Sequence, residues 1–281
     1  MAETSQRTLS GPIIMEGIGI HSGIWARTTL TPAPENSGVA FIVGDTRIPA
    51  LAECVSDTRR CTRLSYGSSS INTVEHLMAS LYALSIDNIT VYVEGGSELP
   101  ILDGSAAGWT QAIMDSGITR QSAQKRWLIP GEKIVIREGD SEIEITPARS
   151  LTVQAEVNFD FWKEGEASAK IETLDTDETD FFCNEIAPAR TFAFQSEVEA
   201  LVAAGLALGG SLDNALIITP PDGFSTPLRM PHEWAVHKLL DLIGDMALTG
   251  GRIAATITAI RPGHRINNLA ARALCERATI E

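Results

Sequence analysis

Short alternating runs of hydrophobic and polar residues occupy the first third of the chain. The segments 28–32 and 38–43 predict strands, because Pro and Gly residues bound each run. A helix is predicted over 73–85, where apolar residues recur every three or four positions and form one stripe. A buried strand over 88–93 and a helix over 106–116 are predicted to follow it.

The second half of the chain repeats this pattern. Its predicted elements are strands over 133–136, 143–145 and 151–159, a helix over 233–248, a strand over 253–260, a polar loop over 261–268 and a last helix. The order helix, turn, strand, loop, helix thus occurs twice, and the two central helices begin about 160 residues apart. We therefore predict an α+β fold of two similar domains, each with a pair of helices packed against β-sheets.

The polar stretch 120–126 has the composition of a linker between these domains. It predicts an N-terminal domain over 1–122 and a C-terminal domain over 123–281. Each central helix carries a histidine near its start, in Val74-Glu75-His76 and in Val236-His237-Lys238. An active site at the domain interface would therefore draw residues from both domains.

Composition narrows the possible functions. The chain has 281 residues, of which 44% are hydrophobic and 21% charged, as is typical of a globular protein. Its formal net charge of −14 argues against nucleic acid as a partner, although an anionic ligand can still bind at a local basic patch. The N-terminus has no secretion signal and the chain has no run of about eighteen apolar residues, so stable membrane insertion is not expected. Four scattered cysteines are typical of free thiols in a reducing compartment, and we expect a cytoplasmic protein.

A candidate metal site begins with the spacing of His237 and Asp241. Four residues apart on a helix, these side chains share one face, with Cβ atoms about 5–6 Å apart. An imidazole nitrogen and a carboxylate oxygen suit zinc, which in catalytic sites typically has three protein ligands and one open position. His76 on the matching helix is the natural third ligand, and Glu75 would stand beside the activated water.

Spacing alone leaves other interpretations of these residues open. A His and an Asp four residues apart also form ordinary pairs on surface helices. Asn72 and Glu75 have the spacing of a helix cap, which would explain Glu75 without catalysis. The chain has no His-Glu-x-x-His sequence of the metalloprotease type.

Two further segments carry candidate chemistry. His264 lies in a glycine-flanked polar segment after a predicted strand, where a protonated imidazole can donate to a leaving group. Asp245 would keep that imidazole protonated by raising its pKa. The alternatives are a local cap or ion pair for Asp245 and a solvated His264. The segment 189–194 offers the hydroxyl of Thr191 beside two aromatic rings, and is otherwise an edge strand or a core segment.

Taken together, these segments resemble one family, the UDP-3-O-acyl-N-acetylglucosamine deacetylases of lipid A biosynthesis. The matching motifs occur in the family's order and cover nearly the whole chain. They are 17–23 (GIGIHSG), 57–62 (DTRRCT), 73–77 (TVEHL), 86–89 (IDNI), 100–107 (PILDGSAA), 189–192 (ARTF), 208–211 (LGGS), 237–245 (HKLLDLIGD) and 263–268 (GHRINN).

The resemblance implies an enzyme with one zinc ion per chain, bound by His76, His237 and Asp241 where the two domains meet. The catalytic roles that it implies are Glu75 as general base, His264 as general acid, Thr191 as a hydroxyl that polarises the amide carbonyl, and Asp245 as the residue that orients His264. The implied reaction hydrolyses the acetamide of UDP-3-O-acyl-N-acetylglucosamine to acetate and a free amine, the committed step of lipid A biosynthesis.

The resemblance also implies a binding site for a nucleotide sugar that carries an acyl chain. The segment 194–217 matches the family's hydrophobic passage. Positions that match or suit substrate contacts are Lys238, Phe192, Cys61, His21, Arg261, Leu201, Leu206, Gly210 and Ser211. The substrate is the only partner expected, and a monomer is favoured.

The nucleotide end departs from the family's pattern. The aromatic partner for uracil falls at Phe159 or Phe161, without the His-Pro element usual there. Ser141 stands where a lysine is expected near the diphosphate, while Arg261 supplies a cation. An alternative function is therefore a divergent zinc deacetylase that acts on another N-acylated amino sugar. A non-catalytic binding protein is disfavoured, because it would be expected to have lost catalytic residues or ligands.

Overall fold

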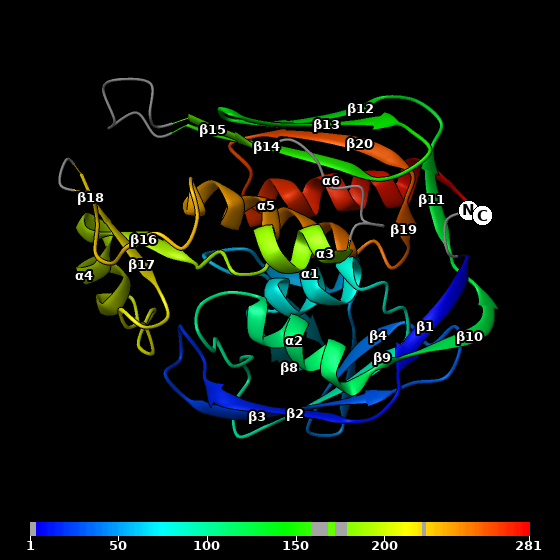
Figure 1. Cartoon of the computed structure of the whole chain (residues 1–281), viewed down its shortest axis with the longest axis horizontal. Coiled ribbons are helices and arrows are strands. Elements are labelled where there is room, and N and C mark those ends of the chain that lie inside the picture. Colours follow the sequence, from blue (N-terminus) through cyan, green and yellow to red (C-terminus); the bar gives the residue numbers. More distant parts are fainter. Residues whose placement is uncertain (1–3, 159–167, 172–178, 221–222) are drawn as a thin grey trace.

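Two five-stranded sheets enclose a layer of helices in the computed structural model of the chain (Figure 1). The structure describes residues 4–158, 168–171, 179–220 and 223–281. One sheet and its helices come from the first half of the chain, and the other sheet and its helices come from the second half. Helices packed against β-sheets agree with the predicted α+β class.

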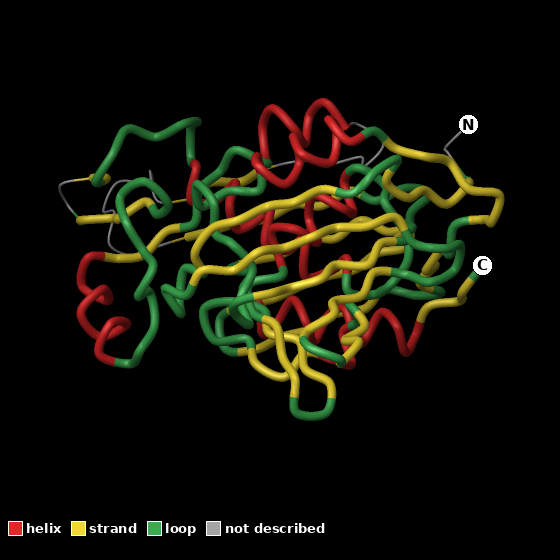
Figure 2. Tube along the Cα trace, turned by 90° about the horizontal axis from the view of Figure 1, so that it is seen from below, coloured by secondary structure: helices red, strands yellow, loops and turns green. Residues whose placement is uncertain are grey.

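The sheet of the first half has the strand order β2-β3-β9-β4-β5. Its strands are β2 (Ile13–Ile18), β3 (Trp25–Pro32), β9 (Ile89–Glu94), β4 (Val39–Val43) and β5 (Thr46–Pro49). All neighbours are antiparallel except β4 and β9, which are parallel. Seen from below, the strands lie in front of the helices (Figure 2).

The sheet of the second half has the same topology, with the order β12-β13-β20-β14-β15. Its strands are β12 (Ile134–Glu138), β13 (Ser141–Pro147), β20 (Ala255–Ile260), β14 (Thr152–Asn158) and β15 (Ser168–Ile171). Again only one neighbouring pair, β14 and β20, is parallel. The predicted repeat of the layout is confirmed, and it extends to the direction of every strand in these two sheets.

Four helices fill the space between the sheets. They are α1 (Glu75–Ala83), α2 (Ala107–Ser116), α5 (Glu233–Ala247) and α6 (His264–Arg277). Every residue of α1 is buried, and in α5 only Lys238 is not. Helices buried on all sides are expected to be apolar around their whole circumference. The ionisable residues of α1 and α5 are therefore exceptions that need a partner or a function.

The remaining elements connect the two halves and build one edge of the molecule. They are β1 (Ser5–Leu9), a 3₁₀ turn (Ala52–Cys54), β6 (Val55–Asp57), β7 (Arg63–Tyr66), β8 (Ser69–Ile71), β10 (Ile118–Gln124), β11 (Trp127–Pro130), α3 (Thr179–Phe181), a π-turn (Phe182–Ile186), β16 (Phe192–Phe194), α4 (Gln195–Ala203), β17 (Leu216–Thr219), β18 (Gly223–Phe224), β19 (Arg252–Ile253) and β21 (Ala278–Ile280). The elements β16, α4, β17 and β18 lie beside the helix layer, at the left of Figure 1.

Two sequence-based expectations are wrong. The stretch 120–126 is no free linker, because most of it belongs to β10, which pairs with β1 at the other end of the N-terminal half, as at Gln124 and Ser5. The segment 261–268 is a loop only as far as Gly263, since α6 begins at His264. The boundary between the domains at residues 122 and 123 remains a prediction, and it falls within β10.

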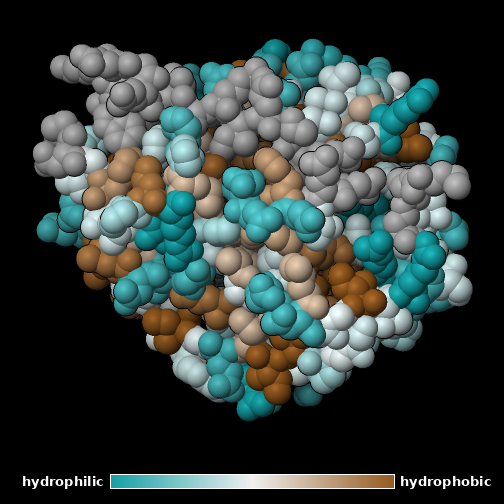
Figure 3. All heavy atoms as spheres, viewed as in Figure 1, coloured by the Kyte–Doolittle hydropathy of each residue, from teal (hydrophilic) through white to brown (hydrophobic). Residues whose placement is uncertain are grey.

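The surface mixes hydrophobic and hydrophilic side chains, as Figure 3 shows for one face. Exposed apolar residues include Ile18, Leu208 and Leu212, which are 40%, 54% and 55% exposed. Among the residues that the structure describes, we found no helix with the length and apolar character needed to cross a membrane.

Candidate active site

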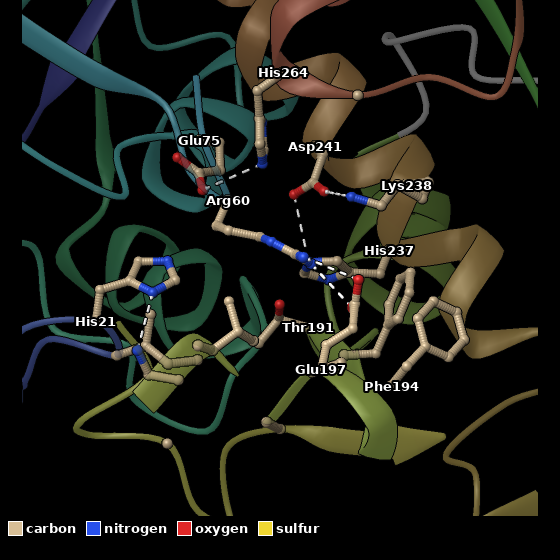
Figure 4. A pocket seen from close by; sticks show the side chains of 18 of the residues that line it. His21, Arg60, Glu75, Thr191, Phe194, Glu197, His237, Lys238, Asp241 and His264 are labelled. Atoms are coloured by element: carbon tan, nitrogen blue, oxygen red, sulfur yellow. Dashed lines mark hydrogen bonds and ion pairs between the residues drawn. The ribbon is translucent and has the colours of Figure 1, made fainter. Parts of the chain in front are cut away.

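A cavity of about 1030 Å³ draws its walls from both halves of the chain (Figure 4). The predicted site residues that line it are His21, Glu75, His76, Thr191, Phe192, Leu201, Gly210, Ser211, His237, Lys238, Asp241, Arg261 and His264. Asp245 lies behind His264, fully buried. Cys61 and Leu206, which were predicted near the substrate, are not among the lining residues that the structure describes.

The candidate metal ligands come together at the junction of α1 and α5. The Nε2 atom of His237 lies 3.3 Å from Oδ1 of Asp241, and Nε2 of His76 lies 3.8 Å from the same oxygen. The two imidazole rings meet edge to face, with centroids 5.0 Å apart. Nδ1 of His237 lies 3.0 Å from the carbonyl oxygen of Ala189. Donation of the Nδ1 proton to that carbonyl leaves the Nε2 lone pair directed at the ligand group.

The three side chains suit a cation. Oδ1 of Asp241 is buried and has no hydrogen-bond donor among the described residues, which would be costly for a carboxylate without a positive partner. Burial lowers the pKa of His76 to about 3 and also lowers the pKa of His237, so both rings are neutral at pH 7. Despite its burial, Asp241 has a pKa far below the usual range, because the positive charges of Lys238 and His264 favour the carboxylate. All three groups are therefore in the protonation state that a divalent metal requires.

A second group of possible ligands, Glu75, Asp241 and His264, shares one carboxylate with the first. It suits a metal less well. Burial would lower the pKa of His264, but the charges of Asp245 and Glu75 outweigh burial and raise the pKa to about 9. Burial raises the pKa of Glu75 to about 8. His264 therefore carries a proton at neutral pH in the metal-free protein, and a protonated imidazole cannot bind a metal.

Glu75 is held by a contact that a helix cap does not explain. Its Oε2 atom accepts a hydrogen bond from the backbone N–H of Thr62 at 3.0 Å, and the side chain is 3% exposed. The side chain of Asn72 instead donates to the carbonyl oxygen of Ser97, and α1 has no side-chain cap. Thr73 has a φ of 57°, which ends the extended backbone before the helix begins at Glu75. The capping interpretation of Asn72 and Glu75 is therefore wrong.

His264 is the first residue of α6 and is 8% exposed, so the alternative of a solvated side chain is wrong. Its Nδ1 atom lies 2.9 Å from Oδ2 of Asp245. Its Nε2 atom lies 3.8 Å from Oε1 of Glu75 and faces the cavity. Asn267, one turn further along α6, donates its Nδ2 hydrogen to the same oxygen of Asp245 at 2.9 Å. Asp245 therefore orients the imidazole, and no local helix cap is needed to account for it.

Thr191 precedes β16, and hydrogen bonds fix the backbone on both of its sides. Its N–H donates to the carbonyl oxygen of Gly104, and its own carbonyl accepts the N–H of Leu216. Beside it, Nζ of Lys238 donates to Oδ2 of Asp241 at 2.8 Å and lies 5.5 Å from the ring centroid of Phe192. The segment is thus a short strand paired in parallel with β17, and it also lines the cavity.

The cavity continues along α4 and β17 with apolar walls. Val198, Leu201, Ala215 and Ile217 line this part, which agrees with the expectation of an acyl passage within 194–217. An ion pair that the sequence did not predict also lines the cavity. Nη1 and Nη2 of Arg60 donate to the two carboxylate oxygens of Glu197, at 3.1 and 2.9 Å (Figure 4).

The expected nucleotide end lies where β12, β13 and α6 meet the cavity. Arg261 has its guanidinium 3.3 Å from Oδ2 of Asp140, and its carbonyl oxygen accepts the hydroxyl of Ser141. Arg265 and Glu138 form an ion pair there, and both line the cavity. Phe159 and Phe161, the candidates for the uracil contact, lie outside the described residues.

Comparison with known proteins gives one consistent result. The family model described as UDP-3-O-acyl N-acetylglycosamine deacetylase matches residues 6–276. The chain is 39% identical over 274 residues to a protein named UDP-3-O-acyl-N-acetylglucosamine deacetylase from Anaeromyxobacter sp. (strain Fw109-5), covering 95% of this chain and 87% of that protein. It is 39% identical to a protein of the same name from Myxococcus xanthus, covering 94% and 84% of the two chains. A third, from Thermosynechococcus vestitus, is 37% identical, with 99% and 96% covered.

Proposed function

This chain belongs to the UDP-3-O-acyl N-acetylglycosamine deacetylase family, and we propose that it hydrolyses the acetamide of a UDP-linked 3-O-acyl-N-acetylglucosamine with a zinc ion at its centre. The products are acetate and a free glucosamine amine, a step of lipid A biosynthesis. The observation that carries the proposal is the meeting of three metal-ligating side chains with an acid and a base in one cavity. A cytoplasmic location and a monomeric state stay predictions.

His76, His237 and Asp241 would hold the zinc ion. Two neutral imidazoles and one carboxylate are a typical donor set for a catalytic zinc site with an open position. When bound there, zinc supplies Lewis acidity, which polarises an amide carbonyl and lets water act as a nucleophile near neutral pH.

Glu75 and His264 would move the protons. Water adds to the carbonyl carbon while Glu75 takes one of its protons, and the hydroxyl of Thr191 donates a hydrogen bond to the carbonyl oxygen. The C–N bond then breaks, and Nε2 of His264 gives its proton to the nitrogen, because an amide anion is a poor leaving group. Asp245 holds Nδ1 of His264 at 2.9 Å, which favours the protonated ring.

The rest of the substrate would extend in two directions from these groups. The apolar walls around Leu201 and Ile217 suit the acyl chain, and the ring of Phe192 and the ammonium of Lys238 would contact the sugar. Arg261 at the opposite end suits the diphosphate as a charge-assisted donor. His21, Gly210 and Ser211 complete the proposed contacts.

The test is acetate release from three compounds by the purified protein. These are UDP-3-O-acyl-N-acetylglucosamine, the same compound without the 3-O-acyl chain, and the 3-O-acyl sugar without UDP. The proposal requires the largest kcat/KM for the first compound. Activity confined to the compound without UDP would instead support the divergent deacetylase, for which the departure at Ser141 is the motivation.

Metal content tests the ligand set separately from activity. The His237→Ala variant should lose the zinc that the wild-type protein retains after dialysis, at one ion per chain. Glu75→Ala should keep its zinc and lose most turnover. Stoichiometric zinc in the His237→Ala variant would show that the ligand set is wrong.

A further inference from the structure

Thr62 contacts both of the carboxylates that serve the proposed proton transfers. It lies in the loop between β6 and β7, and it is 1% exposed. Its backbone N–H donates to Oε2 of Glu75 at 3.0 Å, and its hydroxyl donates to Oδ1 of Asp245 at 2.5 Å. Its carbonyl oxygen accepts the N–H of Val74, the residue before α1. Thr62 thus links the start of α1 to the C-terminal turn of α5.

These contacts close a ring of four residues that come from four parts of the fold. In α5, the second oxygen of Asp245 faces Nδ1 of His264 at 2.9 Å. In α6, Nε2 of His264 lies 3.8 Å from the second oxygen of Glu75. Each carboxylate therefore presents one oxygen to His264 and the other to Thr62. The order around the ring is Thr62, Glu75, His264, Asp245 and back to Thr62.

The terminal torsion of a carboxylate side chain is intrinsically broad, so a second contact is needed to fix the plane of the group. We propose that Thr62 is a positioning residue, which sets the orientation of the Glu75 and Asp245 carboxylates together and so fixes His264 opposite the base. This inference rests on the proposed roles of Glu75 and His264. Thr62 does not line the cavity and acts through these residues.

Asn267 cannot replace Thr62 in this role. Its amide donates to Oδ2 of Asp245, the oxygen that already faces His264. Loss of the Thr62 hydroxyl would leave Oδ1 of Asp245 buried without that donor, and a buried carboxylate would turn to recover a partner. Because Nδ1 of His264 is hydrogen-bonded to Asp245, rotation of that carboxylate would move the imidazole relative to Glu75. A misplacement of about 1 Å can cost about a hundredfold in rate.

The experiment compares Thr62→Val, which keeps the shape and removes the hydroxyl, with Thr62→Ser, which keeps the hydroxyl. We expect Thr62→Val to lower kcat by about ten- to a hundredfold, with KM within about twofold and zinc content unchanged. Thr62→Ser should restore kcat to within a few-fold of the wild type. If Thr62→Val does not fold, Thr62→Cys against Thr62→Ser makes the same comparison at equal size, because a thiol is a weak donor.

A coupling test distinguishes positioning from a general loss of structure. In an Asp245→Asn background, Thr62→Val should change kcat by less than about twofold, because both changes act on one contact. Thr8→Val is the matched control, since Thr8 is also buried and donates its hydroxyl, to the carbonyl of Asn88 at 2.6 Å. It should leave kcat unchanged.

Three outcomes would overturn the inference. They are a folded Thr62→Val variant with wild-type kcat, a Thr62→Ser variant as slow as Thr62→Val, and a fall in kcat that parallels lost zinc. Wild-type protein and Glu75→Gln are measured in parallel. If the wild-type protein releases no acetate, the proposed function itself is wrong. If Glu75→Gln retains turnover, the proposed role of Glu75 is wrong. If Glu75→Gln loses turnover while Thr62→Val does not, only the role of Thr62 is wrong.

Discussion

The Nε2 atom of His264 lies 3.8 Å from Oε1 of Glu75, and both side chains are buried between α1 and α6. Burial, together with the nearby carboxylates of Asp241 and Asp245, raises the pKa of Glu75 to about 8. The same carboxylates raise the pKa of His264 to about 9 against the effect of burial. In the metal-free protein, both groups therefore bind their protons more tightly than in the unfolded chain.

The raised pKa values of Glu75 and His264 predict how the stability of the metal-free protein depends on pH. A raised pKa contributes stability that is complete below the unfolded value, 4.5 for Glu75 and 6.5 for His264, and is lost as pH rises through about 8 and about 9. His76, with a pKa lowered to about 3, acts in the opposite direction only below 6.5. The free energy of unfolding should thus fall by more than about 1 kcal/mol between pH 6.5 and 9.

Urea unfolding of the metal-free protein at several pH values measures this slope. Between pH 6.5 and 8, the Glu75→Gln variant should lose the part of the slope that Glu75 contributes and keep the part that His264 contributes. A free energy of unfolding that rises over this range in the wild-type protein would contradict the assigned pKa shifts.

Metal binding should release a proton from Glu75. The ligands need not lose one, because His76 is neutral at pH 7 and Asp241 is ionised. A divalent cation next to Glu75 favours its carboxylate and lowers its pKa. Calorimetric titration of the metal-free protein with Zn²⁺ at pH 7, in buffers of different ionisation enthalpy, should show net release of up to one proton. The Glu75→Gln variant should bind zinc without that release, and Asp241→Asn should bind it at least tenfold more weakly.

The features predicted from the sequence are those that local patterns determine. The duplicated order of elements and the shared face of His237 and Asp241 follow from helical and strand periodicity. The distance of His76 from them does not, because it depends on how α1 packs on α5. The duplicated layout suggested that pairing and the resemblance to the deacetylase family implied it, and the structure brings the three side chains together.

Contacts between remote residues were not predicted. Arg60 and Glu197 are 137 positions apart, and Thr62 and Asp245 are 183 positions apart. The spacing of residues along the chain does not indicate that either pair is in contact. The segment 120–126 was assigned to a linker for the same reason, since its polar residues alternate on a strand whose partner is at the other end of the N-terminal half. His264 was expected in a loop because its neighbours are polar. The helix α6 that begins there is buried on one side only, so polar residues at its start do not exclude a helix.

Gly244 brings α5 directly against α1. A Cβ atom at this position would lie 2.1 Å from the carbonyl oxygen of Glu75 and 3.1 Å from its Cα. Alanine is the better helix former by about 1 kcal/mol, but the clash is with backbone and forces the helices apart. We expect Gly244→Ala to destabilise the protein by about 1–3 kcal/mol and to lower kcat, because it displaces the residue that carries the base.

Chemical unfolding and steady-state kinetics of Gly244→Ala test this expectation. Gly131→Ala is the control, because a Cβ atom there meets no atom within 4 Å, and its effect should be within about 0.5 kcal/mol. A Gly244→Ala protein as stable and active as Gly131→Ala would refute the close packing of the two helices.

The ion pair between Arg190 and Glu233 ties the Thr191 segment to the first residue of α5. Nε of Arg190 lies 2.7 Å from Oε1 of Glu233, and Nη2 lies 3.0 Å from Oε2. The backbone N–H groups of Arg190 and Arg229 also donate to this carboxylate, which is 0% exposed. Glu233→Gln would leave a guanidinium buried without its counter-charge, which typically costs about 3–5 kcal/mol.

The Glu233→Gln variant should also bind zinc more weakly. The carbonyl oxygen of Ala189, one residue before Arg190, accepts the Nδ1 hydrogen of His237, so movement of this segment releases a ligand. Glu142→Gln, which neutralises the solvent-facing pair with Arg137, is the matched control and should cost less than about 1 kcal/mol. Denaturant unfolding measures the stability of both variants, and zinc titration measures their affinity for the metal. Equal stability of the two variants would show that the buried pair has no special part in holding Thr191 and His237 in place.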